Sequence, residues 1–588
     1  MGTVYINDQE VEVGPKDNVV QAARRAGVEI PHYCWHHELS VVASCRMCLV
    51  EVGEKKPDGT VAMLPRLVPA CQTPAKPGTV VRTDSPKVKT SQEQTLEFLL
   101  LNHPLDCSIC DQAGECYLQD YTFKYGRAHS RLDEPKVHRE DKYHIGDQIA
   151  LFTDRCVMCT RCVRFTREVS GTAELHVVNR GSVEEIEVFP DKPCNNKLAG
   201  NVVDLCPVGA LCSKDFLYKK RVWWLRSADS VCTGCSTGCS ITVDQNENQI
   251  YRLRPRENPQ AQGSFMCDDG RFGWKYVHGD DRLTSPRLGK ATQAQALVGA
   301  SAAGQANAGQ GNAGQGNGKA NSTVGTFAPP ADLQFADPWP EVLQAVRAKF
   351  EETSKKSAQK CLALFSPFMT VEEAYLLAAY LKDVDKGIVL AMGPIPVVGE
   401  DDCYPKDHKG RPPAPEKVRF TIRAEKCPNR RGVEAILKHF QGEVIDFAQA
   451  RERIQRGSVE AALIVGGYEQ ADAWDSAFLS SVQSLTTLVV IDFRRTALTD
   501  QADILLAGAT FAEREGTVVN HAGLAQSLRP AIRATGDARP DGRVWMELAG
   551  RKGLYHPESL RKEIATKIGA FAALGTGELG ELGIKVFG

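Results

Sequence analysis

Short runs of alternating apolar and polar residues mark the beginning of the chain. Residues 3–13 read TVYINDQEVEV, two such runs around an Asn-Asp pair, which predicts a β-hairpin. Residues 17–26 have the apolar spacing of a short helix, and residues 90–101 predict a second one. Long periodic runs are few between residues 100 and 225, so we expect loops there in place of a large apolar core.

From residue 338 onward, apolar strands alternate with helical segments. The runs CLALF, GIVLAM, AALIVGG and TLVVIDF predict strands, whereas VEEAYLLAAYLKDV and residues 473–482 predict helices. Such alternation is typical of a parallel sheet with helices on its faces. Before this half, residues 286–337 contain a low-complexity stretch of Ala, Gly, Gln and Asn, which predicts a flexible linker.

Length and charge narrow the possible partners. The chain has 588 residues, enough for several domains, and a net charge of −2, so no basic field favours nucleic acid. No run of eighteen apolar residues predicts a transmembrane helix, and the first residues lack the features of an export signal. We therefore expect a cytoplasmic protein that docks to something else.

Cysteine is concentrated in the first half of the chain. Of the 20 cysteines, 17 lie before residue 270. In a reducing compartment, clustered thiols indicate metal binding and not disulfides. The cysteines fall into four sets.

The first set has three cysteines in one loop and a distant fourth, as a [2Fe–2S] cluster requires. Its residues are Cys34, Cys45, Cys48 and Cys71. The gap of ten residues after Cys34 is longer than the gap of four in plant-type ferredoxins. Zinc is the alternative, but zinc sites usually pair one CxxC with another, and only one is present here.

The second set combines a histidine with three cysteines. Its residues are His103, Cys107, Cys110 and Cys116. A lone histidine is more often structural, yet these three cysteines otherwise lack a fourth partner. Imidazole can replace thiolate at iron, as in Rieske centres, where it raises the potential. The set therefore predicts a histidine-ligated [4Fe–4S] cluster.

The third set consists of a CxxCxxC run and a fourth cysteine from a Cys-Pro pair far downstream. Its residues are Cys156, Cys159, Cys162 and Cys206. This is the run of bacterial ferredoxins with its last cysteine displaced, which predicts a [4Fe–4S] cluster. Cys194 or Cys212 could replace Cys206, but Pro207 favours Cys206.

The fourth set again has three local thiols and a distant one, which predicts a third [4Fe–4S] cluster with zinc as the alternative. Its residues are Cys232, Cys235, Cys239 and Cys267.

Four one-electron centres in a row are suited to carrying electrons, and no activated nucleophile stands out in the sequence. We therefore expect no independent catalytic site in this chain.

Taken in order, the four sets resemble those of the large iron–sulfur subunit (the bacterial G subunit) of proton-pumping NADH:quinone oxidoreductase, respiratory complex I. The resemblance covers residues 1–285 and is tightest in RCVMCTRCVRFTREVSGT and GNVVDLCPVGAL. It implies a subunit that relays electrons from an NADH/FMN-binding partner toward a quinone-side partner. The subunit would lie at the cytoplasmic side of the inner membrane, with the fourth cluster off the main path.

The C-terminal half resembles molybdopterin oxidoreductases through the segment EREGTVVNHAGLAQ. The residues that carry the resemblance are Glu513, Gly516, Thr517, Asn520, Gly523 and Gln526. Leu524 departs from the arginine that is usual after this glycine. In complex I such a domain carries no molybdenum, so the resemblance implies a structural role.

Enzymes that share these modules are the alternatives. A molybdenum-dependent formate dehydrogenase would have a lysine after its last cluster cysteine, where this chain has Asp269. Iron-only hydrogenases need further clustered cysteines. The electron-transfer subunit of NAD-linked hydrogenases typically ends near the third set.

The predicted fold class is α+β with several domains, and it ends in an α/β domain with a parallel sheet. The expected domains are a [2Fe–2S] ferredoxin-type β-grasp (1–85), a [4Fe–4S] domain (86–225), a further [4Fe–4S] module (226–285), the linker (286–337) and the molybdopterin-oxidoreductase-like domain (338–588). Cys194, Cys212, Cys361, Cys403 and Cys427 have no assigned role, and most should be buried, inert thiols.

Overall fold

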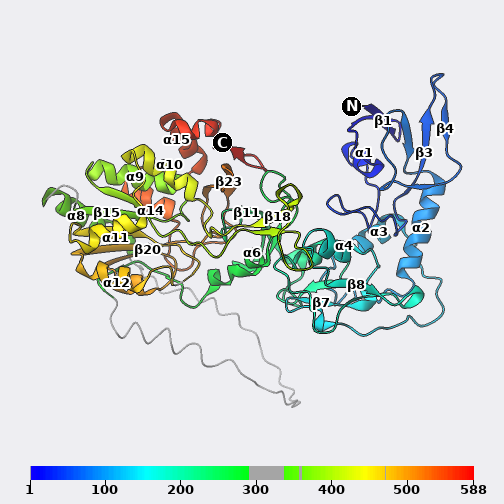
Figure 1. Ribbon diagram of the computed structural model, residues 1–588, viewed down its shortest axis with the longest axis horizontal. Helices are drawn as coiled ribbons and strands as arrows, with labels where there is room; N and C mark the ends of the chain where they lie inside the picture. The colour runs from blue at the N-terminus through cyan, green and yellow to red at the C-terminus, as the bar shows by residue number, and fades with distance from the viewer. Residues whose placement is uncertain (1, 291–336, 357–359, 471, 588) are drawn as a thin grey trace, which may run out of the picture. The chain divides into compact units, whose positions relative to one another are not determined.

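The computed structural model describes residues 2–290, 337–356, 360–470 and 472–587 (Figure 1). The chain forms two compact units, which we call unit 1 (Met1–Trp274 with Val397–Lys426) and unit 2 (Lys275–Pro396 with Cys427–Gly588). Most of the linker expected at 286–337 lies outside the described residues. Two segments differ from the expected domains: residues 275–290 belong to unit 2, and residues 397–426 belong to unit 1.

Unit 1 begins with a mixed sheet crossed by one helix. The strands lie in the order β2 (Gln9–Val13), β1 (Gly2–Ile6), β6 (Thr79–Arg82), β3 (Leu49–Lys55) and β4 (Val61–Met63), with β5 (Val68–Pro69) also paired to β3. β1 and β2 are the predicted hairpin, and its turn residues Asn7 and Asp8 adopt the positive φ that these residue types tolerate. The predicted helix is α1 (Val19–Arg25), which Asn18 caps by accepting a hydrogen bond from Gln21.

The rest of unit 1 consists of short elements joined by long loops. The helices are α2 (Pro86–Leu100), α3 (Tyr117–Tyr125), α4 (Arg161–Glu168), α5 (Asn201–Leu205) and α6 (Asp268–Phe272). The paired strands are β7 (Ile149–Leu151) with β10 (Leu211–Ser213), β8 (Leu175–Val178) with β9 (Glu185–Val188), and the meander β11 (Arg226–Val231), β12 (Ser240–Asn246) and β13 (Gln249–Pro255). Helix α2 is the helix predicted at 90–101; it starts earlier because Ser85 caps it and Pro86 suits its first turn.

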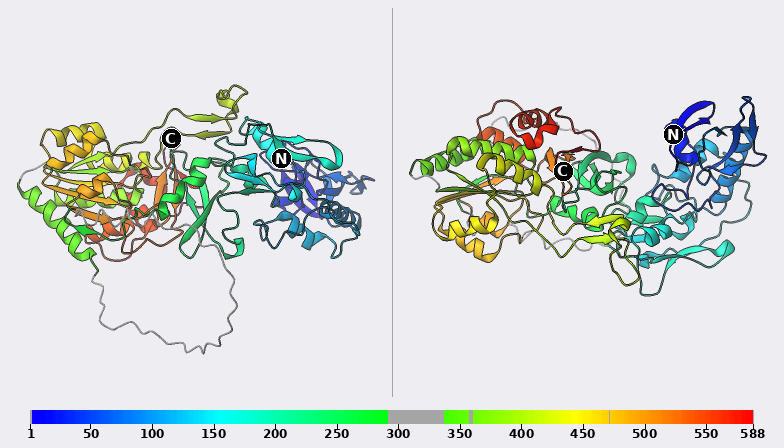
Figure 2. Two further views of the ribbon diagram at one scale, coloured as in Figure 1. Left: turned by 90° about the horizontal axis from the view of Figure 1, so that it is seen from below. Right: turned by 45° about the horizontal axis from the view of Figure 1, so that its top comes forward.

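A hairpin from the second half of the sequence completes unit 1. Its strands are β17 (Asp402–Tyr404) and β18 (Phe420–Ile422), which pair antiparallel. Val397 and Glu425 pair near the ends of the segment. Figure 2 shows this segment in yellow-green beside the cyan elements of the same unit, and the Lys406 amide donates to the Ser170 carbonyl at 2.8 Å. We call residues 397–426 the strap.

Unit 2 is built on a parallel sheet. Its strands lie in the order β14 (Arg287–Leu288), β21 (Ile504–Ala507), β20 (Thr487–Asp492), β19 (Ala461–Val465), β15 (Cys361–Phe365) and β16 (Val389–Met392), and only β14 is antiparallel to its neighbour. The four predicted strands and the helix VEEAYLLAAYLKDV, which is α9 (Val371–Val384), are confirmed. The helix predicted at 473–482 begins later, as α12 (Ser476–Ser481), because Asp475 caps it.

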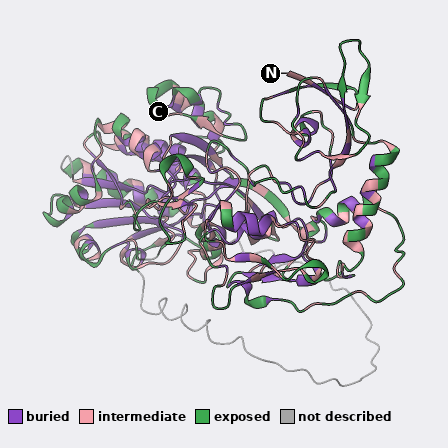
Figure 3. Ribbon diagram, turned by 45° about the vertical axis from the view of Figure 1, so that its right-hand side comes forward, coloured by how far each residue is buried: buried purple, intermediate pink, exposed green. Residues whose placement is uncertain are grey.

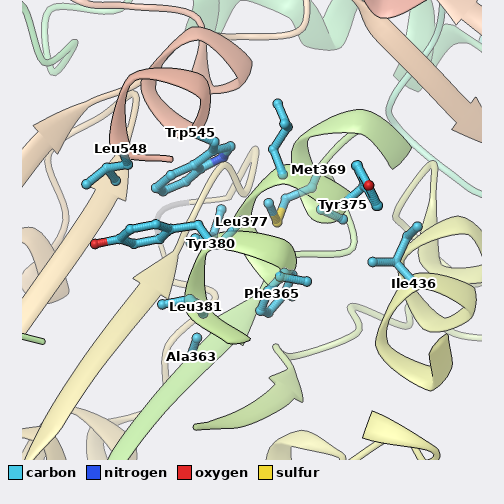
Figure 4. Packing of buried hydrophobic residues seen from close by; sticks show 14 of the residues in the cluster. Ala363, Phe365, Met369, Tyr375, Leu377, Tyr380, Leu381, Ile436, Trp545 and Leu548 are labelled. Carbon is cyan, nitrogen blue, oxygen red and sulfur yellow. The ribbon is translucent and has the colours of Figure 1, made fainter. Parts of the chain in front are cut away.

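Helices cover both faces of this sheet (Figure 1). One face carries α8 (Trp339–Lys356), α9, α10 (Arg430–Gln441), α14 (Asp541–Leu548) and α15 (Pro557–Lys567), and the other carries α11 (Phe447–Gln455), α12 and α13 (Ala497–Gln501). Successive strand residues alternate between the two cores: Ala363 and Phe365 pack on the α9 side, whereas Leu362 and Leu364 face the other side. Figure 3 shows these strands buried, and Figure 4 shows Phe365 and Trp545 in the first core.

The remaining described elements are smaller. They are the sheet β22 (Gly516–Val519), β23 (Leu524–Leu528) and β24 (Ile584–Lys585), and the short 3₁₀ helices η1 (Tyr143–Ile145), η2 (Thr153–Arg155), η3 (Gly181–Val183), η4 (Val222–Trp224), η5 (Gly273–His278), η7 (Pro415–Lys417), η8 (Val482–Ser484) and η9 (Gly569–Leu574). Among the described residues, no helix has both the length and the apolar character needed to cross a membrane.

Candidate iron–sulfur sites

The first set converges beside strands β3 and β5 of the N-terminal sheet. Cys34, Cys45 and Cys48 lie in the loop between α1 and β3, and Cys71 follows β5. Hydrogen bonds from the thiols of Cys45 and Cys71 lower the pKa of the Cys34 thiol, and Cys48 contacts Cys71 in the same way. Contacts between thiols therefore join all four cysteines.

The loop of the first set wraps tightly around its sulfurs. Ala43 and Arg46 have φ of 52° and 58°, a left-handed conformation that residues with a side chain adopt at some cost. The backbone of Ser44 and of Cys45 also lowers the pKa of the Cys34 thiol. Amides that point at a sulfur stabilise its negatively charged form, which is the form that binds iron.

The second set lines a single cavity. The residues His103, Cys107, Cys110 and Cys116 all contribute to its wall, from the loop between α2 and α3. Burial lowers the pKa of His103 to about 4, so its imidazole is neutral at pH 7, the form that binds metal. A Cβ atom on Gly209 would lie too close to the Cys110 sulfur, at 2.2 Å, so only glycine permits this approach.

The third set lines another cavity. Its walls include Cys156, Cys159, Cys162 and Cys206 together with Pro207. Met158 and Thr160 have positive φ, as the tight CxxCxxC loop requires. Burial, reinforced by the charges of the other three thiols of the set, raises the pKa of Cys162 well above its usual value.

The two alternatives to Cys206 lie elsewhere. Cys194 is buried beside Asn196, and Cys212 contacts the Gly209 carbonyl, at a position where the charges of Cys110 and Cys206 both act on it. Neither lines the cavity of the third set. This geometry favours Cys206 as the fourth member.

Two thiols of the fourth set lie beside a glycine. Cys232, Cys235 and Cys239 lie between β11 and β12, and Cys267 caps helix α6. A Cβ atom on Gly270 would lie 2.9 Å from the Cys232 sulfur and 3.6 Å from that of Cys267. These two thiols therefore converge on one glycine, although they are distant in the sequence.

The strap lies against the fourth set. The Ser236 amide donates to the Glu425 carbonyl at 2.9 Å, and the Thr237 hydroxyl donates to the Thr421 carbonyl at 3.1 Å. Tyr404 of the strap is buried, and its pKa is raised first by burial and then by nearby acidic groups, Cys267 among them. The strap thus contacts Ser236 and Thr237, which lie between Cys235 and Cys239. No pattern in the sequence indicated this contact.

The other cysteines are mostly buried, as expected. Cys194, Cys212, Cys361 and Cys427 are buried, and Cys403 is half-buried. Within the described parts of the chain, no three His, Cys, Asp or Glu side chains are grouped so as to hold a single metal ion. Iron–sulfur clusters fit the four sets for three reasons. The sets supply thiol and imidazole donors, two of them line cavities, and Gly209 and Gly270 leave space beside the sulfurs that a Cβ atom would take.

The residues of the molybdopterin-like segment hold unit 2 together. Glu513 pairs with Arg282 at 2.8 Å, and the Thr517 hydroxyl donates to Glu372 at 2.6 Å. Asn520 accepts the amides of Ala522 and Leu524 and so closes the turn between β22 and β23. In this chain these side chains bind other protein groups.

Family models match five regions, and each of the four sets lies inside one of them. The matches are a 2Fe-2S iron-sulfur cluster binding domain (1–86), an NADH-ubiquinone oxidoreductase-G iron-sulfur binding region (92–131), an NADH-quinone oxidoreductase subunit 3 ferredoxin-like domain (146–212), a molybdopterin oxidoreductase Fe4S4 domain (225–279) and a molybdopterin oxidoreductase domain (437–551).

Curated relatives match the first half of the chain. The G subunit of the NADH-quinone oxidoreductase of Rickettsia bellii is 40% identical over 288 residues, which are 48% of this chain and 40% of that protein. The NADH-ubiquinone oxidoreductase 75 kDa subunit of Reclinomonas americana is 43% identical over 46% of this chain and 38% of its own length. The chain therefore matches less than half the length of these relatives.

A solved structure of an NAD+-reducing [NiFe]-hydrogenase is 28% identical over 38% of this chain and 91% of its own, with a TM-score of 0.33. That score is too low for an argument from shape. The family models and the curated relatives agree with one another and with the order of the four sets. The first half of this chain is therefore homologous to the G subunit of the NADH-quinone oxidoreductases, and its second half carries a molybdopterin oxidoreductase domain.

Proposed function

We propose that this chain is the iron–sulfur electron-transfer subunit of an NADH:quinone oxidoreductase of the complex I type. The observation that carries the proposal is the presence of four separate convergent sets of thiols in unit 1, one of which includes a half-buried histidine. When bound, an iron–sulfur cluster accepts and releases single electrons. Four such sites suit a relay from an NADH/FMN module toward quinone.

The proposed ligands are the sixteen residues of the four sets. Cys34, Cys45, Cys48 and Cys71 would hold one [2Fe–2S] cluster, and three [4Fe–4S] clusters would be held by His103, Cys107, Cys110 and Cys116, by Cys156, Cys159, Cys162 and Cys206, and by Cys232, Cys235, Cys239 and Cys267. The protein contributes dry, tightly wrapped loops and directed amides, which set potentials through burial and hydrogen bonding.

The surface of the second set supports docking to a partner. Cys107 is exposed, unlike the other cysteines of the four sets. The neighbouring Leu105 and Phe123 side chains are each 88% exposed, and Phe123 also lines the cavity. Exposed apolar side chains of this size mark interaction surfaces. We infer that FMN/NADH-binding and quinone-side subunits are the partners, at the cytoplasmic side of the membrane.

The arrangement of unit 2 disfavours the alternative of a molybdenum enzyme of the formate dehydrogenase type. In open α/β sheets, ligands bind where the strand order reverses, which here is the end of β15 and β19. Phe368 and Tyr468 follow these two strands, are almost fully buried, and pack edge to face at 5.2 Å. The Tyr468 hydroxyl donates to the Pro394 carbonyl at 2.9 Å. Side chains occupy the place where a cofactor would enter.

Elemental analysis of the anaerobically purified full-length chain tests the proposal. Four loaded sets predict about 14 irons per chain without molybdenum or stoichiometric zinc. One molybdenum or tungsten per chain would make unit 2 a catalytic site, and zinc in place of iron would remove the electron-transfer function. About 10 irons would mean that one [4Fe–4S] cluster is absent, and the relay would stay intact only if the missing cluster is that of the fourth set.

A further inference from the structure

Two buried arginines on helix α4 connect the loops of the first and third sets. The Arg164 Nη2 atom donates to the Cys34 carbonyl at 2.5 Å and to the Cys159 carbonyl at 3.1 Å. One nitrogen therefore bridges the backbone of a proposed ligand in each set. Its Nη1 atom donates to the Ser40 carbonyl at 2.5 Å and fixes the guanidinium against the first loop.

Arg161 makes a second connection of the same kind. Its Nη2 atom donates to the Trp35 carbonyl at 2.6 Å, next to Cys34. Its Nη1 atom donates to the Leu205 carbonyl at 3.2 Å, next to Cys206. Both arginines therefore hold the loop of the first set against the loop of the third set.

The positive charges of these two arginines have no carboxylate partner. Their exposed fractions are 5% and 7%, and among the described residues neither forms an ion pair with Asp or Glu. Their polar contacts are backbone carbonyls and, for Arg164, the Thr160 hydroxyl at 3.3 Å. Burying a guanidinium without a counter-charge costs free energy of folding. These two arginines therefore indicate a nearby anion other than a carboxylate.

The neighbouring anions would be the thiolate-bound clusters. The Arg164 guanidinium lies against the backbone of Cys34 and Cys159, and the Arg161 guanidinium lies against residues next to Cys34 and Cys206. Positive charge this close to a proposed ligand favours its thiolate form. Each loop that the two guanidinium groups contact thus carries proposed ligands, which are negatively charged when iron is bound.

We propose that Arg161 and Arg164 form a shared cationic bridge between the first and third sets. Their positive charge raises the reduction potentials of both the first-set and the third-set clusters. The inference rests on the proposed function, since it requires clusters in these two sets. A nearby cation stabilises the more negative, reduced form of a cluster, so it raises the potential. Because one guanidinium contacts both loops, it acts on both centres at once. The arginines are positioning residues.

Redox titration of the full-length chain, followed by EPR with dithionite as reductant, tests the bridge. Arg164→Gln keeps a donor group but removes the charge, and it should lower the potentials of both the binuclear centre and the third-set centre. The second-set and fourth-set signals should not move. Arg167→Gln is the matched control, because Arg167 is exposed on the same helix. A fully loaded Arg164→Gln protein with either potential unchanged would overturn the proposal.

Arg164→Lys decides the case in which the glutamine variant loses iron. Lysine keeps the charge, so iron content and both potentials should stay at the wild-type values. A lysine variant in which only one of the two centres shifts, or in which both fall, would contradict a shared charge. The wild-type sample distinguishes failure of this proposal from failure of the proposed function. Absence of iron from the wild type would refute the function. Full iron in the wild type, with unchanged potentials in the Arg164 variants, would refute only the bridge.

Discussion

His103 differs from the other fifteen proposed ligands because it brings no negative charge. It lies in the wall of the second cavity with three thiols, and burial keeps its imidazole neutral at pH 7. A neutral ligand leaves the cluster less negative, which favours reduction. The chemical type of one residue should therefore distinguish the second centre from the third.

We expect His103→Cys to keep its iron and to lower the potential of one centre, because an anion replaces a neutral group. EPR spectra during a redox titration measure both the signal and its potential. His129→Cys is the control, since His129 is exposed and lies outside the set. An unchanged spectrum would remove His103 from the proposed ligands.

Glycine decides whether the fourth set can converge. Replacing Gly270 with alanine would place a Cβ 2.9 Å from the Cys232 sulfur, closer than packed atoms allow. We expect this variant to lose the fourth cluster, so that iron falls from about 14 to about 10 per chain. Gly273→Ala is the control, because beyond its immediate chain neighbours no atom lies within 4 Å of the position that its Cβ would take. Equal iron in both variants would show that the set does not close around Gly270.

At the level of helices and strands, short elements leave the loops free to wrap metal. Cys116 and Cys267 sit at the N-terminal caps of α3 and α6, where helix amides stabilise a thiolate. Cys162 lies in the first turn of α4, the helix that also carries Arg161 and Arg164. One helix therefore positions both a proposed ligand and the charges that act on it.

The strap is the element that shields the fourth set. Replacing residues 400–422 with an Asn-Gly turn should be tolerated, because the Val398 amide already bonds to the Ala424 carbonyl at 2.9 Å. In air, we expect the variant to lose about four irons faster than the wild type, since water and oxygen reach the set. Iron release during timed exposure measures this. The other three sets serve as the internal control, and equal rates would show that the strap gives no shielding.

Across the whole molecule, the two units depend on metal in different ways. Unit 2 has an extensive apolar core on each face of its sheet. The part of unit 1 between α2 and α6 has short elements and long loops, so bound clusters should supply much of its stability.

Removal of iron with a chelator should therefore unfold most of unit 1 and spare unit 2. Hydrogen exchange of the full-length chain measures this, with protection lost in α4 and α5 and retained in β19 and β20. The strap should lose protection together with unit 1, although its sequence lies within the second half. Retained protection in the strap after iron removal would contradict its assignment to unit 1.

Local sequence patterns predicted helices and strands well where nearby residues determine a turn or the buried face of an element. The Asn-Asp pair of the first hairpin, the capped helix α9 and the apolar strands of unit 2 follow from the sequence in this way. Helix starts were predicted less accurately, because the caps Ser85 and Asp475 act outside the apolar pattern. Motif spacing alone also indicates His103 and Cys206 as members of their sets.

The amino-acid sequence alone determined three features: the types of donor, their grouping into four sets, and the alternation of strands and helices. It could do so because these features depend on neighbouring residues. The three-dimensional packing was needed to show that Cys206, and neither Cys194 nor Cys212, lines the third cavity. It was also needed to show that residues 397–426 cover the fourth set and that Arg164 joins two loops. The last two contacts link residues more than a hundred positions apart, so their energy depends on how the chain packs, and no local pattern records it.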